Sequence, residues 1–459
     1  MNHQKDTIAA ISTPVGLGAV GIVRLSGPDA LAITGKIFTP GRKKKSLEPY
    51  RLVHGWIASI SGEALDEVLV SFMPGPGSYT GEDTIEINCH GNPAILEGVL
   101  EAVLALGARM AEPGEFTKRA FLNGKMDLTR AEAVIELINA PTQAGVFMAR
   151  NKLQGLLAEK IQGLRQSLEE LKKQLCLAVD FPEEEIECLS QKDLAGQALA
   201  CCTDLRGLIT DSDQNRIWTD GALVVLTGRV NAGKSSLMNA ILGRERAIVT
   251  ELPGTTRDYL EEGLNLKGLP VRLVDTAGLR ATADQVEKKG MERGWELIRS
   301  AHVLVLVMDA TLAPSPQDQE VLAQTDPEKL IIALNKWDLA ASPLPWIKTI
   351  EHDYPDVLKI SAKTGLGLEQ LLSRIRQKAL AGQELDPGGC LLPNLRQKSC
   401  LEKAVLELEA LAGEALAGIP YDLLAARLDY ACAELDQITG RITPDEVLDS
   451  IFDNFCIGK

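Results

Sequence analysis

The spacing of apolar and polar positions changes character several times along this chain of 459 residues. Residues 1–122 contain short apolar runs, namely Ala19–Leu25, Val68–Phe72 and Thr84–Ile87, between turns rich in glycine and proline. Apolar runs of this length, bounded by turn residues, predict strands. We therefore expect residues 1–122 to form a compact α/β domain.

Residues 123–215 and 382–459 show a helical period instead. In the first segment apolar residues recur every three or four positions, which is one face of a helix packed into a core. The same period returns through Leu401, Val405 and Leu408. The seam in the first segment consists of Leu157, Ile161, Leu164, Leu168, Leu171 and Leu175.

Between these helical segments, residues 216–381 alternate buried-type strands with helical stretches. This order predicts a parallel sheet covered by helices. The α/β unit would then interrupt a helical domain, whose two segments, 123–215 and 382–459, pack together. The expected strands are Ala222–Thr227, Val271–Asp275, Val303–Met308, Leu330–Leu334 and Val357–Ile360.

The first of these strands leads into a phosphate-binding motif. Residues 228–235 read GRVNAGKS, which matches GxxxxGK[ST] in full and precedes a helical run. The glycines let backbone N–H groups curl around phosphate oxygens. Lys234 is expected to neutralise phosphate charge, and Ser235 to bind Mg²⁺.

Three further motifs follow later strands, and two of them suit guanine. Residues 275–278 (DTAG) suit Mg²⁺ and γ-phosphate binding, and residues 361–363 (SAK) suit the guanine oxygen. In residues 335–338 (NKWD), the Asp338 carboxylate can accept hydrogen bonds from guanine N1–H and N2–H₂, a donor pair that adenine lacks. Together these motifs predict a P-loop GTPase domain at residues 216–381.

Two positions depart from a Ras-like site. Leu279 follows DTAG where a water-orienting glutamine stands in Ras-like proteins, and leucine cannot polarise water. Asn231 in the P-loop is a neutral oxygen donor suited to a monovalent cation, although loop capping is an alternative role. Thr256, in the segment GTTRD at 254–258, is the candidate for a second Mg²⁺ ligand.

Composition narrows the class of protein further. A net charge of −15 argues against broad, non-specific adhesion to nucleic acid or anionic membrane. The cationic run Arg42–Lys45 is typical of a solvated loop. Nine cysteines without a CxxC pair indicate reduced thiols. With no signal peptide and no membrane-spanning run in the sequence, we expect a cytoplasmic protein.

Segments outside the GTPase domain resemble one family. Residues 11–28 (ISTPVGLGAVGIVRLSGP), 76–83 (PGSYTGED), 111–128 (AEPGEFTKRAFLNGKMDL) and 455–459 (FCIGK) resemble the MnmE/TrmE family of tRNA-modification GTPases, end to end. The resemblance implies a folate-binding, homodimerising N-terminal domain and an FAD-containing partner protein in a heterotetramer. Together they would modify C5 of the wobble uridine of tRNA with an aminomethyl or carboxymethylaminomethyl group. A reduced folate, 5-formyl- or methylene-tetrahydrofolate, would supply the carbon, and glycine or ammonium the nitrogen.

The resemblance also implies roles for residues of the GTPase domain. Lys234, Thr256 and Glu287 would be catalytic, with Glu287 orienting the attacking water through a second water. Ser235 and Thr256 would hold Mg²⁺, while Asn231, Thr250, Leu252 and Thr255 would surround K⁺. On sequence alone, Glu287 could equally be a solvated helix charge. The full expected GTP-binding set is Asn231, Ala232, Gly233, Lys234, Ser235, Ser236, Thr250, Glu251, Leu252, Pro253, Gly254, Thr255, Thr256, Asp275, Thr276, Ala277, Gly278, Asn335, Lys336, Trp337, Asp338, Ser361, Ala362 and Lys363.

For folate, the positions that match the family are Arg24, Glu82, Lys125 and Lys459. A carboxylate can read the N–H and amino donors of a pterin, and cations can meet the glutamate tail. Cys456 is either a participant in the modification or a small, inert buried thiol.

Two other functions fit part of the sequence. One is an Era-like, GTP-dependent ribosome-assembly or RNA-chaperone factor, against which the acidic charge and the lack of an evident RNA-binding motif weigh. The other is a dimeric regulatory switch without modification chemistry, which failure to bind a reduced folate would favour.

Overall fold

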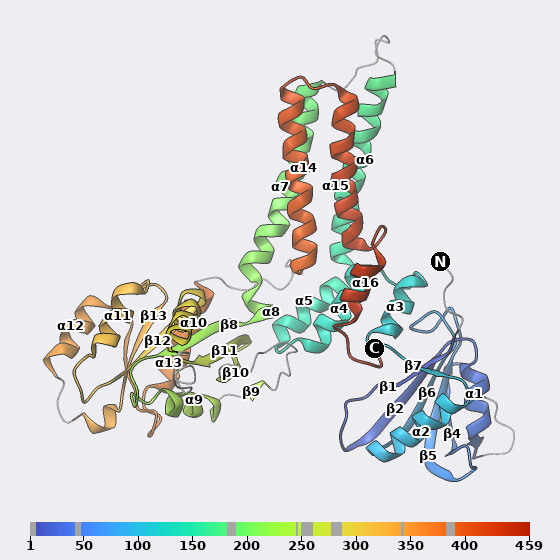
Figure 1. Ribbon diagram of the computed structural model, residues 1–459, viewed down its shortest axis with the longest axis horizontal. Helices are drawn as coiled ribbons and strands as arrows, with labels where there is room; N and C mark the ends of the chain where they lie inside the picture. The colour runs from blue at the N-terminus through green and yellow to red at the C-terminus, as the bar shows by residue number, and fades with distance from the viewer. Residues whose placement is uncertain are drawn as a thin grey trace. The chain divides into compact units, whose positions relative to one another are not determined.

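The computed structural model describes residues 6–41, 47–180, 190–244, 247–248, 260–276, 287–340, 344–381 and 391–459. The chain divides into two compact units, one formed by Met1–Ile135, Lys152–Leu205 and Ser399–Lys459, the other by Glu136–Asn151 and Arg206–Lys398. Each unit contains a seven-stranded sheet (Figure 1). The domain boundaries expected after residues 122, 215 and 381 stay predictions.

The sheet of the first unit has the strand order β3-β4-β5-β6-β2-β1-β7. All neighbours pair antiparallel except β1 with β7. Alternate residues face the core: Val68 and Val70 are buried, while Glu67 and Leu69 are exposed. Helices α1 (Ala30–Ile37) and α2 (Pro93–Ala105) share one hydrophobic core with this sheet. The strands are β1 (Ile8–Ile11), β2 (Gly18–Ser26), β3 (Phe38–Pro40), β4 (Leu52–Ala58), β5 (Ala64–Met73), β6 (Thr84–Gly91) and β7 (Arg109–Met110).

Helix α3 (Glu115–Leu122) packs on β1 through Phe116, which is fully buried beside Ile8 and Ala10. Helices α4 (Leu128–Asn139) and α16 (Asp445–Phe452) form a second apolar cluster. Phe455, beyond α16, joins that cluster, and its ring centroid lies 5.3 Å from that of Phe452. The last residues of the chain are therefore held close to the N-terminal sheet.

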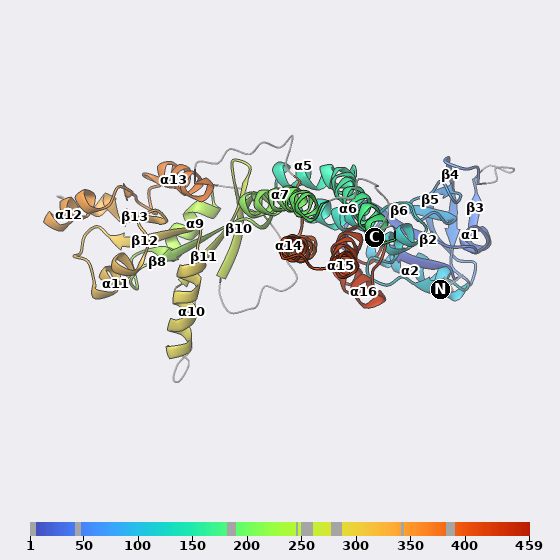
Figure 2. The same ribbon diagram turned by 90° about the horizontal axis from the view of Figure 1, so that it is seen from above.

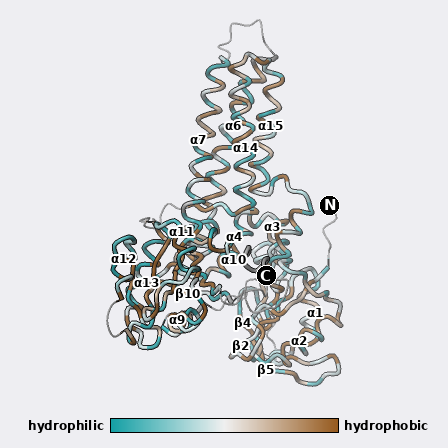
Figure 3. The backbone as a smooth tube through the Cα atoms, turned by 60° about the vertical axis from the view of Figure 1, so that its left-hand side comes forward, coloured by the Kyte–Doolittle hydropathy of each residue, from teal (hydrophilic) through white to brown (hydrophobic). Residues whose placement is uncertain are grey.

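The predicted helical seam lies within α6 (Leu156–Asp180), and every one of its six residues is at most 7% exposed. Ion pairs from Arg165 to Asp436 and from Lys172 to Asp429 join α6 to α15 (Tyr421–Thr439). Figure 2 views these helices end on, and Figure 3 shows apolar and polar positions alternating along them. Segments before and after the GTPase region thus pack together, which confirms the predicted discontinuous helical domain. Helices α7 (Gln191–Asn215) and α14 (Leu395–Leu416) run from one unit into the other.

The sheet of the second unit has the order β14-β13-β12-β8-β11-β10-β9. The five predicted strands are present and pair in parallel, in keeping with buried strands such as β8, whose residues are all buried. The sequence analysis missed β9 and β10, which pair antiparallel at one edge. The strands are β8 (Ala222–Thr227), β9 (Ala247–Ile248), β10 (Leu260–Leu266), β11 (Leu269–Asp275), β12 (Val303–Asp309), β13 (Leu330–Asn335) and β14 (Val357–Lys359).

Helices cover both faces of this second sheet. The core on one face includes residues of α9 (Lys234–Leu242) and α13 (Leu368–Leu380), and the core on the other includes α11 (Pro316–Gln324) and α12 (Pro345–Asp353). The remaining helices of this unit are α5 (Gln143–Leu153), α8 (Ile217–Asp220) and α10 (Glu287–Ser300). Across the described residues, none of the helices has the length and apolarity that crossing a membrane requires.

Candidate functional site

The P-loop leaves β8 at a position that only glycine can fill. Gly228 has φ +134°, and a Cβ there would lie 2.2 Å from the Val307 carbonyl oxygen. Gly233 has φ +97°, and its Cβ would lie 2.2 Å from Asn335 Nδ2. Asn231 adopts a left-handed conformation with φ 64°. The backbone therefore curls tightly against β12 and β13, as phosphate binding requires.

Lys234 lies inside this curl at the start of α9. Only 6% of it is exposed, and its Nζ donates to the carbonyl oxygens of Gly228 at 2.8 Å and Arg229 at 2.9 Å. The N-terminal N–H groups of α9 begin at the same point, where the helix dipole favours an anion. Ammonium and helix end together form a cradle for phosphate.

Ser235 and Asp275 bring two oxygen donors together. Ser235 Oγ donates to Asp275 Oδ2 at 2.8 Å, and Asp275 is 1% exposed. The neighbouring Thr276 hydroxyl donates to the Leu226 carbonyl at 3.0 Å, which ties the end of β11 to β8. Hydroxyl and carboxylate oxygens are the ligands that Mg²⁺ prefers, so these residues fit the expected metal.

Asn335 connects the loops of the nucleotide site. Its Nδ2 donates to the Ala232 carbonyl at 2.9 Å, and its Oδ1 accepts from the Ala362 N–H at 3.0 Å. The Trp337 N–H donates to the Ile360 carbonyl at 3.1 Å. The P-loop, the NKWD loop and the SAK loop are thus held at one end of the sheet.

The remaining guanine-motif residues lie on the same loops. Ser361 is fully buried, and its Oγ accepts from the Thr364 N–H at 3.2 Å. Asp338 and Lys363 are exposed, as are Ser235 and Ser236 at the start of α9. The exposed Asp338 carboxylate is free to meet a base at this end of the sheet.

Lys336 has a partner that the sequence analysis missed. Its Nζ lies 2.7 Å from Asp309 Oδ2, the last residue of β12. Burial opposes ionisation of Asp309, but hydrogen bonds from Lys336 and Thr311 outweigh it and hold the pKa of Asp309 below its ordinary value. The sequence did carry a signal for this carboxylate. Asp309 directly follows the apolar run Val303–Met308, just as Asp275 directly follows the apolar run of its own strand.

Several expected site residues lie outside the described part of the chain. Glu287 is the first residue of α10. The water-orienting role expected of Glu287 remains a prediction. The roles expected of the residues outside the described part of the chain also remain predictions. Those residues are Thr250, Glu251, Leu252, Pro253, Gly254, Thr255, Thr256, Ala277 and Gly278.

In the first unit, Arg24 links β2 to β6 and to the end of the chain. Its Nε and Nη2 donate to Glu86 Oε1 at 3.0 and 2.8 Å, and its Nη1 donates to the Gly458 carbonyl at 3.2 Å. Its guanidinium also lies over the Phe116 ring, 5.7 Å from the centroid. Arg24 is therefore fixed in place next to the chain terminus.

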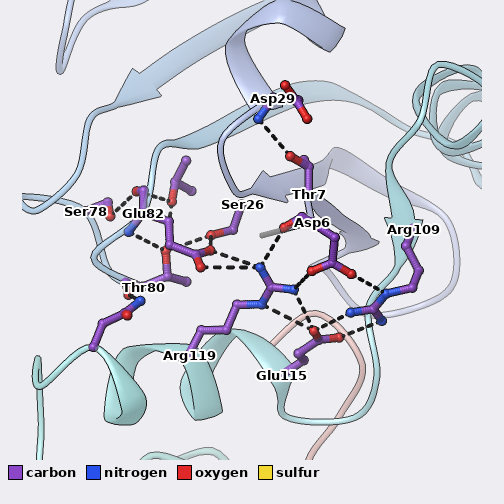
Figure 4. A network of polar contacts seen from close by, with 12 residues as sticks. Asp6, Thr7, Ser26, Asp29, Ser78, Thr80, Glu82, Arg109, Glu115 and Arg119 are labelled. Carbon is purple, nitrogen blue, oxygen red and sulfur yellow. Dashed lines mark hydrogen bonds and ion pairs between the residues drawn. The ribbon is translucent and has the colours of Figure 1, made fainter. Parts of the chain in front are cut away.

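Glu82 lies beside Ser26. Ser26 is two positions along β2 from Arg24, so the two side chains lie on the same face of that strand. Ser26 Oγ donates to Glu82 Oε2 at 2.7 Å, and Arg119 Nη1 lies 3.3 Å from both carboxylate oxygens (Figure 4). Ser26 and Thr80, whose hydroxyls are 2.7 Å apart, are fully buried. The structure thus brings Glu82 and Arg24 to neighbouring positions.

Arg119 is the centre of a wider ionic network. Its Nη2 donates to Asp6 Oδ1 at 2.7 Å and to Glu115 Oε1 at 2.8 Å, and Arg109 binds the same two carboxylates (Figure 4). Burial alone would raise the pKa of both acids, but bonds from the two arginines hold each pKa below its ordinary value. The sequence analysis missed this network.

Lys125 and the chain terminus complete the folate-candidate set. Lys125 Nζ donates to the Pro76 carbonyl at 2.7 Å, so it lies against the loop that carries Glu82. At the terminus, the Cys456 carbonyl accepts from the N–H of Gly114 at 3.4 Å and from that of Lys459, also at 3.4 Å. Cys456 is exposed, so it is not the buried thiol that one alternative required.

Known proteins match this chain along its length. The family described as "GTP-binding protein TrmE N-terminus" matches residues 7–125, and the one described as "MnmE helical domain" matches residues 128–456. The chain is 48% identical over 462 residues to the tRNA modification GTPase MnmE of Nitratidesulfovibrio vulgaris (strain DP4), covering 100% of both. It is 42% identical over 457 residues to that of Lawsonia intracellularis, covering 99% of this chain and 100% of the relative. It is 41% identical over 459 residues to that of Carboxydothermus hydrogenoformans, with the same coverage.

Proposed function

This chain belongs to the MnmE/TrmE family of tRNA-modification GTPases, and from that premise we propose a potassium-dependent reaction cycle that uses a reduced folate. The protein is a GTP hydrolase that acts in tRNA modification. In our proposal it works with an FAD-containing partner to transfer a one-carbon unit to C5 of the wobble uridine. The product would carry an aminomethyl or carboxymethylaminomethyl group. The arrangement of Glu82, Arg24 and the chain terminus in the first unit carries the folate part of this proposal.

For GTP, each described residue has a role that follows from its position. Lys234 and the N-terminus of α9 would bind the phosphates, and Asp338 would read the guanine edge. Ser235, with Thr256, would hold Mg²⁺, which screens the negative charge of the phosphates when bound. Asn335, itself one of the expected GTP-binding residues, keeps the P-loop and the guanine loops together.

For potassium, Asn231 supports the proposal. Asn231 is exposed and has a left-handed backbone conformation. It lies in the P-loop, next to where the β- and γ-phosphates would bind. Its amide oxygen suits a monovalent cation, and Thr250, Leu252 and Thr255 would supply the other oxygens. Because Leu279 cannot orient water, Glu287 would take that role.

For folate, the charges of the first unit suit both ends of the molecule. The Glu82 carboxylate can accept hydrogen bonds from the pterin N–H and amino groups, while Lys125 and Lys459 can meet the glutamate tail. Cys456 is exposed on the terminal segment that Arg24 holds, and we propose that it takes part in the modification. Homodimerisation through the N-terminal domain is part of the same proposal.

The potassium site is tested by GTP hydrolysis in KCl and in NaCl at equal ionic strength. We expect K⁺ to raise kcat roughly a hundredfold to a thousandfold, the scale of one well-placed electrostatic group. Asn231→Ala should remove most of that difference, whereas Asn239→Ala, the same substitution at an exposed position of α9, should keep it. Equal rates in both salts would refute the potassium site and point to an activating protein.

The folate site is tested by titrating 5-formyltetrahydrofolate into the full chain by calorimetry. We expect Glu82→Gln to weaken binding about tenfold or more, because a charged acceptor is lost. The control is Glu67→Gln, since Glu67 lies on the same sheet and forms an exposed ion pair with His54. Binding that is equal in both variants would contradict this site, and no binding to the wild type would favour a regulatory switch.

A further inference from the structure

Asp309 is a buried carboxylate on which charges from two nucleotide loops converge. It ends β12 and is 4% exposed. Its Oδ2 lies 2.7 Å from Lys336 Nζ in the NKWD loop and 3.7 Å from Arg229 Nη2 in the P-loop. Its Oδ1 accepts from the Thr311 N–H at 3.0 Å and from the Thr311 hydroxyl at 2.6 Å. A carboxylate this buried stays charged only when such partners surround it.

Lys336 needs this support because its backbone is strained. Its φ of 61° lies in the left-handed region, which residues other than glycine rarely adopt. Such conformations persist when the surroundings over-determine them, and they cluster at ligand sites. Here the Ala310 N–H donates to the Asn335 carbonyl at 2.9 Å, so the residue after Asp309 also holds this turn.

The turn at Lys336 determines where Asp338 lies. On one side of Lys336, both the nitrogen and the oxygen of the Asn335 side-chain amide are hydrogen-bonded. On the other side, the Trp337 N–H donates to the Ile360 carbonyl. Between these two anchors, the Lys336 side chain is tied by its ion pair with Asp309. Neutralising Asp309 would release the turn, and this change removes no group that is expected to touch a nucleotide.

We propose that Asp309 is a positioning residue for guanine recognition, which acts through Lys336 to hold the NKWD loop ready for the base. Asp338 then meets guanine N1–H and N2–H₂ without a prior rearrangement of the loop. Preorganisation of this kind lowers the cost of binding and slows dissociation. Asp309 itself contacts neither base nor phosphate.

Arg229 offers the alternative route, through the P-loop. Its Nη2 is farther from the carboxylate than Lys336 Nζ, and among the described residues it has no hydrogen-bond partner. An effect carried by Arg229 would change phosphate binding and would be the same for every base. The two routes therefore differ in their dependence on the nucleotide.

The test compares GDP with IDP, whose base lacks the N2 amino group, on the full chain. We expect Asp309→Asn to speed dissociation of fluorescently labelled GDP about tenfold, the scale of one charge-assisted hydrogen bond. It should also reduce the preference for GDP over IDP, because a displaced Asp338 loses the bond to N2. Equal loss for both nucleotides, or unchanged dissociation, would overturn the proposal.

A double-mutant cycle identifies the route. In the Lys336→Met background, Asp309→Asn should change GDP dissociation less than about twofold, whereas with Arg229→Met the two effects should multiply. The opposite pattern would overturn the proposal. If Asp309→Asn does not fold, Asp309→Glu, which keeps the charge but displaces the carboxylate from Lys336 by one methylene, must show the faster dissociation and the reduced GDP preference. Its failure to do so would count equally against the proposal.

Discussion

At the scale of single residues, the buried arginine Arg119 helps to arrange three acidic side chains of the first unit. Arg119 is 9% exposed in its side chain and contacts the carboxylates of Asp6, Glu82 and Glu115. A buried ion is tolerated only when partners replace its water, so the three carboxylates stabilise the Arg119 charge and Arg119 in turn fixes their positions. Glu82, the candidate folate-reading residue, is therefore held by a side chain that need not touch the folate.

We expect Arg119→Met to lower the free energy of unfolding by about 1.5–3 kcal/mol, because three carboxylates lose charge-assisted hydrogen bonds while Arg109 still pairs with Asp6 and Glu115. Urea denaturation of the full chain measures this. The control is Arg51→Met. The Arg51 side chain is 72% exposed and pairs with Glu48, so the loss should stay below about 1 kcal/mol. Similar losses in both variants would show that the network contributes little.

His90 provides a prediction about pH. The Asp66 carboxylate accepts a hydrogen bond from the exposed His90 imidazole and so raises the pKa of His90 above its ordinary value. Because the folded pKa is the higher one, this contact adds stability below a pH of about 6.5 and loses it as the pH rises through the folded value. An NMR titration should show the raised pKa, and Asp66→Asn should return it towards 6.5. An unshifted wild-type pKa would contradict the contact.

Sequence motifs predicted the residues that phosphate-binding chemistry places close together in the chain. Lys234 and Ser235 follow from one local pattern, and the structure places both at the start of α9. Asp309 and Arg119 could not be predicted in this way, because their roles depend on partners 27 and up to 113 positions away. No local spacing encodes such pairs.

At the scale of elements, apolar periodicity predicted the strands and helices that are buried on both sides or along one stripe. β8 and β12 are buried throughout, and the seam of α6 follows the predicted spacing. β10 escaped prediction because its sequence, LEEGLNL, has neither a continuous apolar run nor strict alternation. The edge position of β9 and β10 explains why they need less apolar surface.

The terminal segment gives an element-scale prediction. Gly458 has φ +95°, and a Cβ there would lie 2.5 Å from the Ile11 carbonyl oxygen. We therefore expect Gly458→Ala to displace the tail from Arg24 and to weaken binding of 5-formyltetrahydrofolate severalfold, while the unfolding free energy falls by only about 1–2 kcal/mol. Calorimetry and urea denaturation measure the two effects.

Gly413→Ala is the matched control, because nothing lies within 4 Å of a Cβ at this position of α14. There we expect unchanged folate binding and a gain of about 0.5–1 kcal/mol from helix propensity. Unchanged folate binding in Gly458→Ala would contradict a role for the chain terminus in the site.

At the scale of the whole molecule, one chain carries a GTPase domain and, on our proposal, a separate folate site. A net charge of −15 gives the chain little general attraction for tRNA. We therefore propose that much of the tRNA-binding surface belongs to the FAD-containing partner. GTP binding and hydrolysis would then shift the populations of the chain's conformations through contacts with the γ-phosphate.

The most direct test is to reconstitute the modification and to measure wobble-uridine nucleosides by mass spectrometry. The reaction contains this protein, its FAD-containing partner, substrate tRNA, a reduced folate, a nitrogen donor and GTP in KCl. Our account predicts a C5-modified uridine that disappears when a non-hydrolysable GTP analogue replaces GTP and falls sharply with Glu82→Gln. Unmodified tRNA in the complete reaction, or modification that is equally strong without GTP hydrolysis, would contradict it.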